Sequence, residues 1–378
     1  MPDTTIHLAL TDDWELRGNG SGRIAQIQFH PMKELRRIYE SYGVRSTFNV
    51  EVMQQLAFRK FQDKHKELKP LADEWDDHVR EAFRHGQDIQ LHVHPQWSKV
   101  QYKNGRWILS GDWALPNYDQ DTAYSMLAES KTYLEELLHP LDPAYRCVAF
   151  RAGASIIAPS KFALSLLVKL GIVFDMSIVG GLSVNTRNLR FDYTDCEESF
   201  LPFYPLMEDA RRVSDKTEPI ICVPIFHFTL SRRQSFRQTV LKAVRQAGQK
   251  SSRGAKENEG KTDYANQEWA EVGRSSRLAR VYDKAIRPSL AGKYMVADIS
   301  QLDYAGLKEM IAAIRLRARA TKLSCVPVIL TNHSKYIKDF FDIERFIAEI
   351  SKAVDIKFAT LTELAERLQA GEYPVRKA

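Results

Sequence analysis

Two short clusters of polar residues in this chain combine side chains that could bind a metal ion and hydrolyse a substrate. The first is Asp12-Asp13, which follows the mostly apolar run Ile6–Leu10. Adjacent carboxylates at the end of a buried strand are costly to remove from water, so they need a cation or a proton as a partner. A metal ligand beside a general base would explain the pair, although Asp is also common in an ordinary strand-to-loop turn.

The second cluster is His92-Val93-His94. In an extended chain, residues two apart point to the same side, so both imidazoles can face one ion. Imidazole and carboxylate ligands suit Zn²⁺, and three protein ligands leave one position open for water. Alternatively, the two histidines could simply bond to backbone or loop groups at the end of a strand.

Three further polar sites also follow apolar runs, and each has a structural alternative. Arg151 needs an anion if it is buried, and Asp12 is a candidate, but backbone carbonyls could serve as well. Asp175 and Ser177 resemble ordinary turn residues as much as catalytic ones. His333 could act as a general acid or be a surface histidine.

The elements that must position these residues alternate between strands and helices along the chain. Apolar runs separated by amphipathic helical patterns predict a parallel sheet covered by helices. About seven such units favour a deformed (β/α) barrel, in which chemistry gathers at the carboxyl ends of the strands. The expected strands are Ile6–Leu10, Ser46–Val50, Asp88–His92, Cys147–Arg151, Val173–Ser177, Ile220–Phe228 and Val326–Thr331.

The order of these motifs resembles the polysaccharide deacetylase superfamily, which is carbohydrate esterase family 4 with its NodB-homology domain. The resemblance rests on Thr11-Asp12-Asp13, the histidine motif after Gly86, Phe150-Arg151, Asp175-x-Ser177 and a last strand that ends in His333. It covers roughly residues 6 to 333. The resemblance implies a deformed barrel with a divalent metal ion, most often Zn²⁺, with Co²⁺ or Mn²⁺ as alternatives.

Residue roles also follow from the resemblance. It implies that Arg151 orients the base and that Asp175 orients the general acid. The roles that it assigns are general base to Asp12, metal-binding carboxylate to Asp13, first metal histidine to His92, and general acid to His333.

The chain departs from the family pattern at two points. The family's second histidine lies four residues after the first, where this chain has Gln96, so the ligand role of His94 rests on strand geometry. Trp14 replaces the glycine that follows the acid pair, which is expected to reshape the rim. Similar His-x-His variants occur in the family's branches associated with surface-polysaccharide biosynthesis. Aromatic residues that could stack on a sugar, or simply pack in the core, are Trp14, Trp97, Tyr193 and Trp113.

Charge divides the chain into three parts. The segment Ser231–Lys293 carries 15 Lys and Arg against 6 Asp and Glu, so its net charge is +9, whereas the whole chain has +6. We expect this segment to be a partly mobile basic insertion that separates a first part of the barrel (1–230) from the last strand and C-terminal helices (294–378). It could touch a membrane or a lipid-linked substrate. No zinc-finger spacing or interleaved aromatics predict nucleic-acid binding.

The expected function is metal-dependent removal of an N-acetyl group from an amino sugar. The N-terminus lacks a signal-peptide pattern, which predicts a cytoplasmic protein and a nucleotide- or lipid-linked precursor of a surface polysaccharide as substrate. Two alternatives stay open: hydrolysis of a non-sugar amide, and a catalytically silent carbohydrate-binding protein.

Overall fold

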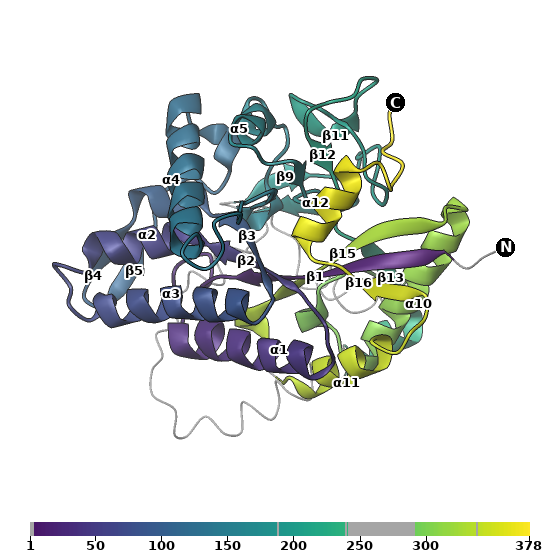
Figure 1. Cartoon of the computed structure of the whole chain (residues 1–378), viewed down its shortest axis with the longest axis horizontal. Coiled ribbons are helices and arrows are strands. Elements are labelled where there is room, and N and C mark those ends of the chain that lie inside the picture. The colour runs from purple at the N-terminus through teal and green to yellow at the C-terminus, as the bar shows by residue number, and fades with distance from the viewer. Residues whose placement is uncertain (1–3, 187–188, 239, 241–291, 338) are drawn as a thin grey trace, which may run out of the picture.

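Seven parallel strands form one curled sheet at the centre of the computed structural model, in the order β12-β7-β6-β3-β2-β1-β15 (Figure 1). The model describes residues 4–186, 189–238, 240, 292–337 and 339–378. The strands are β1 (Thr5–Trp14), β2 (Thr47–Glu51), β3 (Asp88–Val93), β6 (Ala149–Ala152), β7 (Phe174–Asp175), β12 (Ile221–Cys222) and β15 (Cys325–His333). Each of the seven predicted strand segments overlaps one of them.

Single bridges close this sheet into a deformed barrel, as predicted. Beyond β12 the chain runs to Ile225, which pairs in parallel with Ile329 of β15, and the Phe226 N–H donates to the Ile329 carbonyl at 3.0 Å. Further along β15, Thr331 pairs with Asp298. A short extra strand, β16 (Ile356–Phe358), pairs with the first half of β1, whereas β2 pairs with its second half.

Side chains alternate between the two faces of each strand, which separates the barrel interior from the helical layer. Part of the barrel interior is filled by a cluster of buried apolar residues that includes Ala9, Phe174 and Ile329. Residues of α12 (Leu361–Gln369) belong to the same cluster, so this helix closes the end of the barrel where the strands begin. Its first turn is fixed by a capping box between Thr360 and Glu363.

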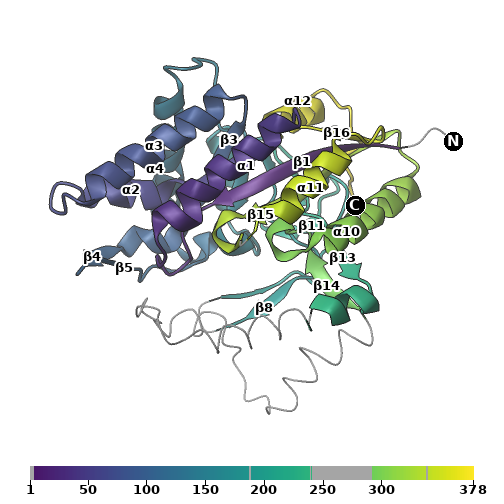
Figure 2. The same cartoon turned by 90° about the horizontal axis from the view of Figure 1, so that it is seen from below.

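Helices cover the outside of the barrel (Figures 1 and 2). In Figure 2, α1 and α11 lie across β1, with α3 beside α1. Helix α2 begins directly after β2, with Glu51 as its N-cap and no loop residue between the two elements. The helices are α1 (His30–Ser41), α2 (Val52–Phe61), α3 (Leu68–Arg84), α4 (Gln120–Leu138), α5 (Ala163–Lys169), α10 (Tyr304–Thr321) and α11 (Phe341–Ile350).

Short antiparallel pairs decorate the barrel. They are β4 (Gln101–Lys103) with β5 (Arg106–Ile108), β8 (Ser183–Asn185) with β9 (Arg190–Asp192), β10 (Pro205–Leu206) with β11 (Asp209–Val213), and β13 (His227–Leu230) with β14 (Lys293–Val296).

The last of these pairs brings together the two ends of the predicted basic insertion. Leu230 of β13 lies opposite Lys293 of β14, so the chain leaves and re-enters at adjoining positions. Residues 241–291, which carry most of the insertion, lie outside the described residues, and the three-part division stays a prediction. None of the helices in the described ranges combines the length and the hydropathy that a membrane span requires.

Candidate metal centre

The alternation of β1 decides which acids face the barrel interior. Asp13 and Glu15 point inward, where they meet residues from β2, β3, β6 and the end of β15. Asp12 points outward to the helical layer: it accepts hydrogen bonds from the Tyr39 hydroxyl of α1 at 3.1 Å and from the Asn332 amide. The adjacent acids therefore lie on opposite faces of the sheet.

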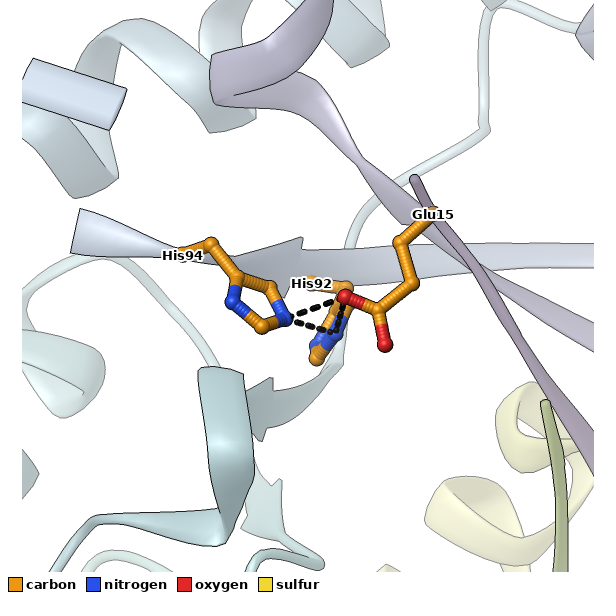
Figure 3. A group of neighbouring side chains, drawn as sticks. All are labelled: Glu15, His92 and His94. Carbon is orange, nitrogen blue, oxygen red and sulfur yellow. Dashed lines mark hydrogen bonds and ion pairs between the residues drawn. The ribbon is translucent and has the colours of Figure 1, made fainter. Parts of the chain in front are cut away.

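Glu15, His92 and His94 form a compact, buried group at the carboxyl ends of β1 and β3 (Figure 3). The Nε2 atom of His94 lies 2.5 Å from Glu15 Oε2, and that of His92 lies 3.7 Å from the same oxygen. The two Nε2 atoms are 3.0 Å apart. One carboxylate oxygen and two imidazole nitrogens thus converge on a single point, which is the type of ligand set that Zn²⁺ takes in catalytic sites.

Hydrogen bonds behind the two histidines support this assignment. His92 Nδ1 lies 2.9 Å from the Arg151 carbonyl, which can only accept, so Nδ1 carries a proton and Nε2 is the nitrogen that would give up its proton to bind an ion. The Gln96 amide nitrogen lies 2.8 Å from His94 Nδ1. Gln96 Oε1 is buried with no hydrogen-bond partner among the described residues. A half-turn of this amide would let Oε1 accept from Nδ1–H, the tautomer that a ligating His94 requires, at the cost of the hydrogen bond that Gln96 Nε2 donates to the Gly18 carbonyl at 3.3 Å.

Lys335 is a further buried charge in this group. It comes from the 3-10 turn Ser334–Tyr336 after β15, and its Nζ lies 2.6 Å from Glu15 Oε1. Glu15 therefore presents one oxygen to the ammonium and the other to the histidines. Burial alone would raise the pKa of Glu15, but His94 and Lys335 outweigh it and hold that pKa well below its usual range. The Glu15 carboxylate is ionised and ready to bind a cation.

The histidines differ in charge. Burial would lower the pKa of His92, but Asp13 and Glu15 raise it to about 9, whereas burial lowers the pKa of His94. Glu51, at the end of β2, faces the same interior, and burial raises the pKa of its carboxyl to about 8. The interior therefore combines an ionised Glu15 with a neutral acid.

A second group surrounds Asp13. Its carboxylate lies 3.0 Å from Arg151 Nε and 3.4 Å from His333 Nε2, and it accepts a hydrogen bond from the Asn49 amide at 3.1 Å. Burial would raise the pKa of Asp13, but Arg151, His92 and His333 together lower it. On its other side, His333 Nδ1 lies 2.8 Å from Asp298 Oδ2. A carboxylate, an imidazole and a second carboxylate thus stand in line.

Asp175 does not orient His333 in this structure. Its neighbours Phe174 and Met176 pack in the interior cluster, so Asp175 faces the opposite side, where it accepts from the Ser177 hydroxyl at 2.6 Å. Burial raises the pKa of its carboxyl to about 6. Similarly, Arg151 pairs with Asp13 rather than with Asp12. Both differences have one cause. Asp175 and Asp12, the partners expected for His333 and Arg151, each lie one residue away from a strand position whose side chain faces the interior.

Three of the four aromatic residues that could stack on a sugar are packed inside the protein. Trp14 is fully buried against Trp75, with its indole N–H bonded to the Gln28 carbonyl at 2.7 Å. Tyr193 is also fully buried, and Trp97 is 4 % exposed. None of the three offers a ring face to a sugar in this conformation. Trp113 is more open and lies edge-on to His94, with ring centroids 6.3 Å apart.

Sequence reasoning missed Glu15, Lys335 and Asp298. Glu15 had a usable signal: it stands two residues after Asp13, the same spacing that groups His92 with His94. Lys335 and Asp298 had none, because each reaches the site from a turn next to β15 whose path depends on the closure of the barrel.

The chain matches no protein-family model and no curated protein. Polysaccharide deacetylases and family 4 carbohydrate esterases are nevertheless among the solved structures similar to it. A protein from Mycobacterium smegmatis described as a polysaccharide deacetylase is 14 % identical with a TM-score of 0.47, over 100 % of this chain and 95 % of that one.

Two other similar structures differ in activity. Puue allantoinase is 11 % identical with a TM-score of 0.46, over 97 % of this chain and 90 % of its own. A family 4 acetyl xylan esterase from Clostridium thermocellum, in complex with a cobalt ion, is 17 % identical with a TM-score of 0.26, over 52 % and 63 %. Likenesses this distant carry no residue role over to this chain, so its barrel and its site rest on their own geometry.

Proposed function

We propose that this protein is a metal-dependent hydrolase that removes an N-acetyl group from an amino sugar. One observation carries the proposal: the buried group Glu15–His92–His94 lies directly beside the line Asp13–His333–Asp298, at the carboxyl ends of the strands. The first group can hold an ion and the second can move protons, and hydrolysis of an unactivated amide needs both. The resemblance of the motif order to the deacetylase superfamily supports the choice of substrate.

Glu15, His92 and His94 would hold the ion, and Zn²⁺ suits one carboxylate and two imidazoles best, with Co²⁺ or Mn²⁺ as alternatives. Such an ion supplies a Lewis acid for the acetyl carbonyl and acidifies a water molecule. Lys335 keeps Glu15 Oε1 occupied, which leaves Oε2 as the ligand atom. His92 and His94 are held in place by the Arg151 carbonyl and by Gln96.

Asp13 takes the role of general base in this proposal, in place of Asp12. It is ionised, it faces the interior, and Arg151 and Asn49 fix its orientation. Asp12 lies behind the strand, where it contacts Tyr39 and Asn332 and cannot reach a substrate bound in the barrel.

His333 takes the role of general acid, and Asp298 orients it from behind. At 21 % side-chain exposure, His333 is the most open member of this group, as a residue that meets the leaving group must be. The reaction forms a bond between water oxygen and the acetyl carbon and breaks the bond from that carbon to nitrogen. The proton that Asp13 takes from water and the proton that His333 gives to the amine balance, leaving acetate and the free amino sugar.

We retain a cytoplasmic location and a nucleotide- or lipid-linked precursor of a surface polysaccharide as parts of this proposal. The basic segment Ser231–Lys293 could draw such an anionic substrate or a membrane surface toward the barrel.

Acetate release from N-acetyl amino sugars by the zinc-loaded protein tests the proposal. We expect turnover by the wild type, loss of turnover together with zinc in Glu15→Gln, and loss of turnover with zinc retained in Asp13→Asn. Asp12→Asn is the matched control and should keep both. Turnover of small amides but not of sugars would favour a non-sugar amidohydrolase, and sugar binding without acetate release would favour a silent homologue. Either result would overturn the proposal.

A further inference from the structure

A large cavity opens beside the metal centre, outside the barrel interior. Its volume is about 850 Å³, within the range of pockets that enclose a small-molecule ligand. The loop after β1 forms one wall, the β4–β5 hairpin another, and α2 and the start of α3 the floor. The apolar side chains that line the floor and walls include Ile24, Phe58, Leu68, Leu71, Ile108 and Leu109.

The cavity and the metal centre share a wall. Leu16 lines the cavity and directly follows Glu15. Trp113 also lines it and lies edge-on to His94 at 6.3 Å. Gly18 packs so closely on the Trp113 ring that a β-carbon there would lie 2.1 Å from a ring atom, and the Gly18 carbonyl accepts from Gln96, the partner of His94. A ligand bound in the cavity would therefore lie within reach of the reacting group.

The aromatic residues of this cavity are not arranged to stack on a sugar. Trp107 is stacked on Phe58, with ring centroids 5.1 Å apart and planes at 8°, and Tyr102 packs against it at 4.5 Å. Trp113 lies over Gly18. With these rings engaged by protein atoms, the cavity offers hydrocarbon surface rather than open ring faces, and such surface favours an aliphatic group.

The charged residues that line the cavity are all basic. Arg17, Arg23, Lys103 and Arg106 are exposed, and no acidic side chain occurs among the described residues that line it. Basic groups around an apolar cavity complement a molecule that has both a hydrocarbon chain and a negative charge.

We propose that this cavity binds the hydrocarbon chain of an anionic amphiphile, which makes the substrate a lipid-linked phosphate or a similar chain-bearing anion. This inference rests on the proposed function for its link to catalysis, but the binding itself does not depend on metal. Each methylene group buried in the cavity contributes about 0.8 kcal/mol, so each should tighten binding about fourfold until the cavity is full.

Calorimetric titration with octyl, decyl and dodecyl phosphate, below their micellar concentrations and in EDTA, tests the proposal. We expect the Kd to fall by about 15-fold for each pair of methylenes added. Dodecyl maltoside, which is uncharged, should bind more weakly than dodecyl phosphate, and inorganic phosphate should show no comparable affinity. Equal affinities for the three chain lengths, or equal affinities for the charged and the uncharged amphiphile, would overturn the proposal.

Two matched variants locate the binding site. Ile108→Glu places a carboxylate in the cavity at a side chain that is 44 % exposed, and Leu206→Glu does the same on β10, away from the cavity, at 42 % exposure. The first should weaken dodecyl phosphate binding more than tenfold and the second should not, with unchanged circular dichroism in both. Equal loss in both would contradict the assignment. Chain binding without acetate release would refute the proposed function alone, and acetate release without chain-length dependence would refute the cavity alone.

Discussion

Replacement of the two adjacent acids by asparagine should affect stability very differently. Asp13 pairs with Arg151 at 3.0 Å, and both side chains are 2–3 % exposed. Asp13→Asn leaves the guanidinium buried beside a neutral amide, and breaking one side of a buried ion pair costs about 3–5 kcal/mol.

Asp12→Asn should be tolerated. Burial raises the pKa of the Asp12 carboxyl to about 7, so near neutral pH its charge destabilises the folded state. An asparagine at this position can accept from the Asn332 amide and donate to the Tyr39 hydroxyl, which is both a donor and an acceptor. We therefore expect Asp13→Asn to be less stable than Asp12→Asn by at least about 2 kcal/mol.

Urea unfolding at pH 7.5 in EDTA, followed by fluorescence, measures the two free energies of unfolding. The double variant Asp13→Asn/Arg151→Met is the control, because removing both partners should cost less than removing Asp13 alone. If Asp12→Asn proves as destabilising as Asp13→Asn, or if the double variant recovers nothing, the assignment of the two acids to opposite faces is refuted.

Three further results are expected. The pKa of the Asp12 carboxyl in the folded protein is raised from 3.8 to about 7, so its contribution to stability is fully present below pH 3.8 and is lost as the pH rises through 7. The stability of Asp12→Asn relative to wild type should therefore increase by roughly 4 kcal/mol from pH 4 to 8. A difference in urea titrations that does not change with pH would contradict this. Lys335→Met should lower the free energy of unfolding in EDTA by about 3 kcal/mol. Zinc should raise the Tm of this variant more than that of wild type, since the ion replaces the lost charge beside Glu15. Equal increases in Tm on adding zinc would argue against this. Asp298→Asn should lower kcat about 100-fold with KM and zinc content unchanged, because His333 loses its orienting partner, and a change confined to KM would count against that role.

The sequence predicts the barrel well because strand and helix periodicities are local properties. All seven expected strand segments overlap strands of the sheet. The strand that was not expected is β16, because its pairing with β1 joins parts of the chain that are far apart in the sequence.

The site was harder to predict because side-chain direction depends on phase. A motif that contains two adjacent acids identifies the strand end correctly, yet only one of the two can face the interior. Residues two apart on a strand point to the same side. Applying this alternation to β1, as well as to His92 and His94, would have grouped Glu15 with Asp13. The partners of His333 and Glu15, which are Asp298 and Lys335, depend on how the barrel closes around β15, and no local pattern encodes that closure.

The identity of the carboxylate ligand is the most direct test of the metal centre. The zinc content of the wild type, Glu15→Gln and Asp13→Asn can be measured by elemental analysis after loading and dialysis, with circular dichroism to confirm folding. The geometry of Glu15, His92 and His94 predicts one tightly held ion per chain in the wild type and in Asp13→Asn, and none in Glu15→Gln. Retention of zinc by Glu15→Gln, with loss from Asp13→Asn, would contradict the proposed ligand set.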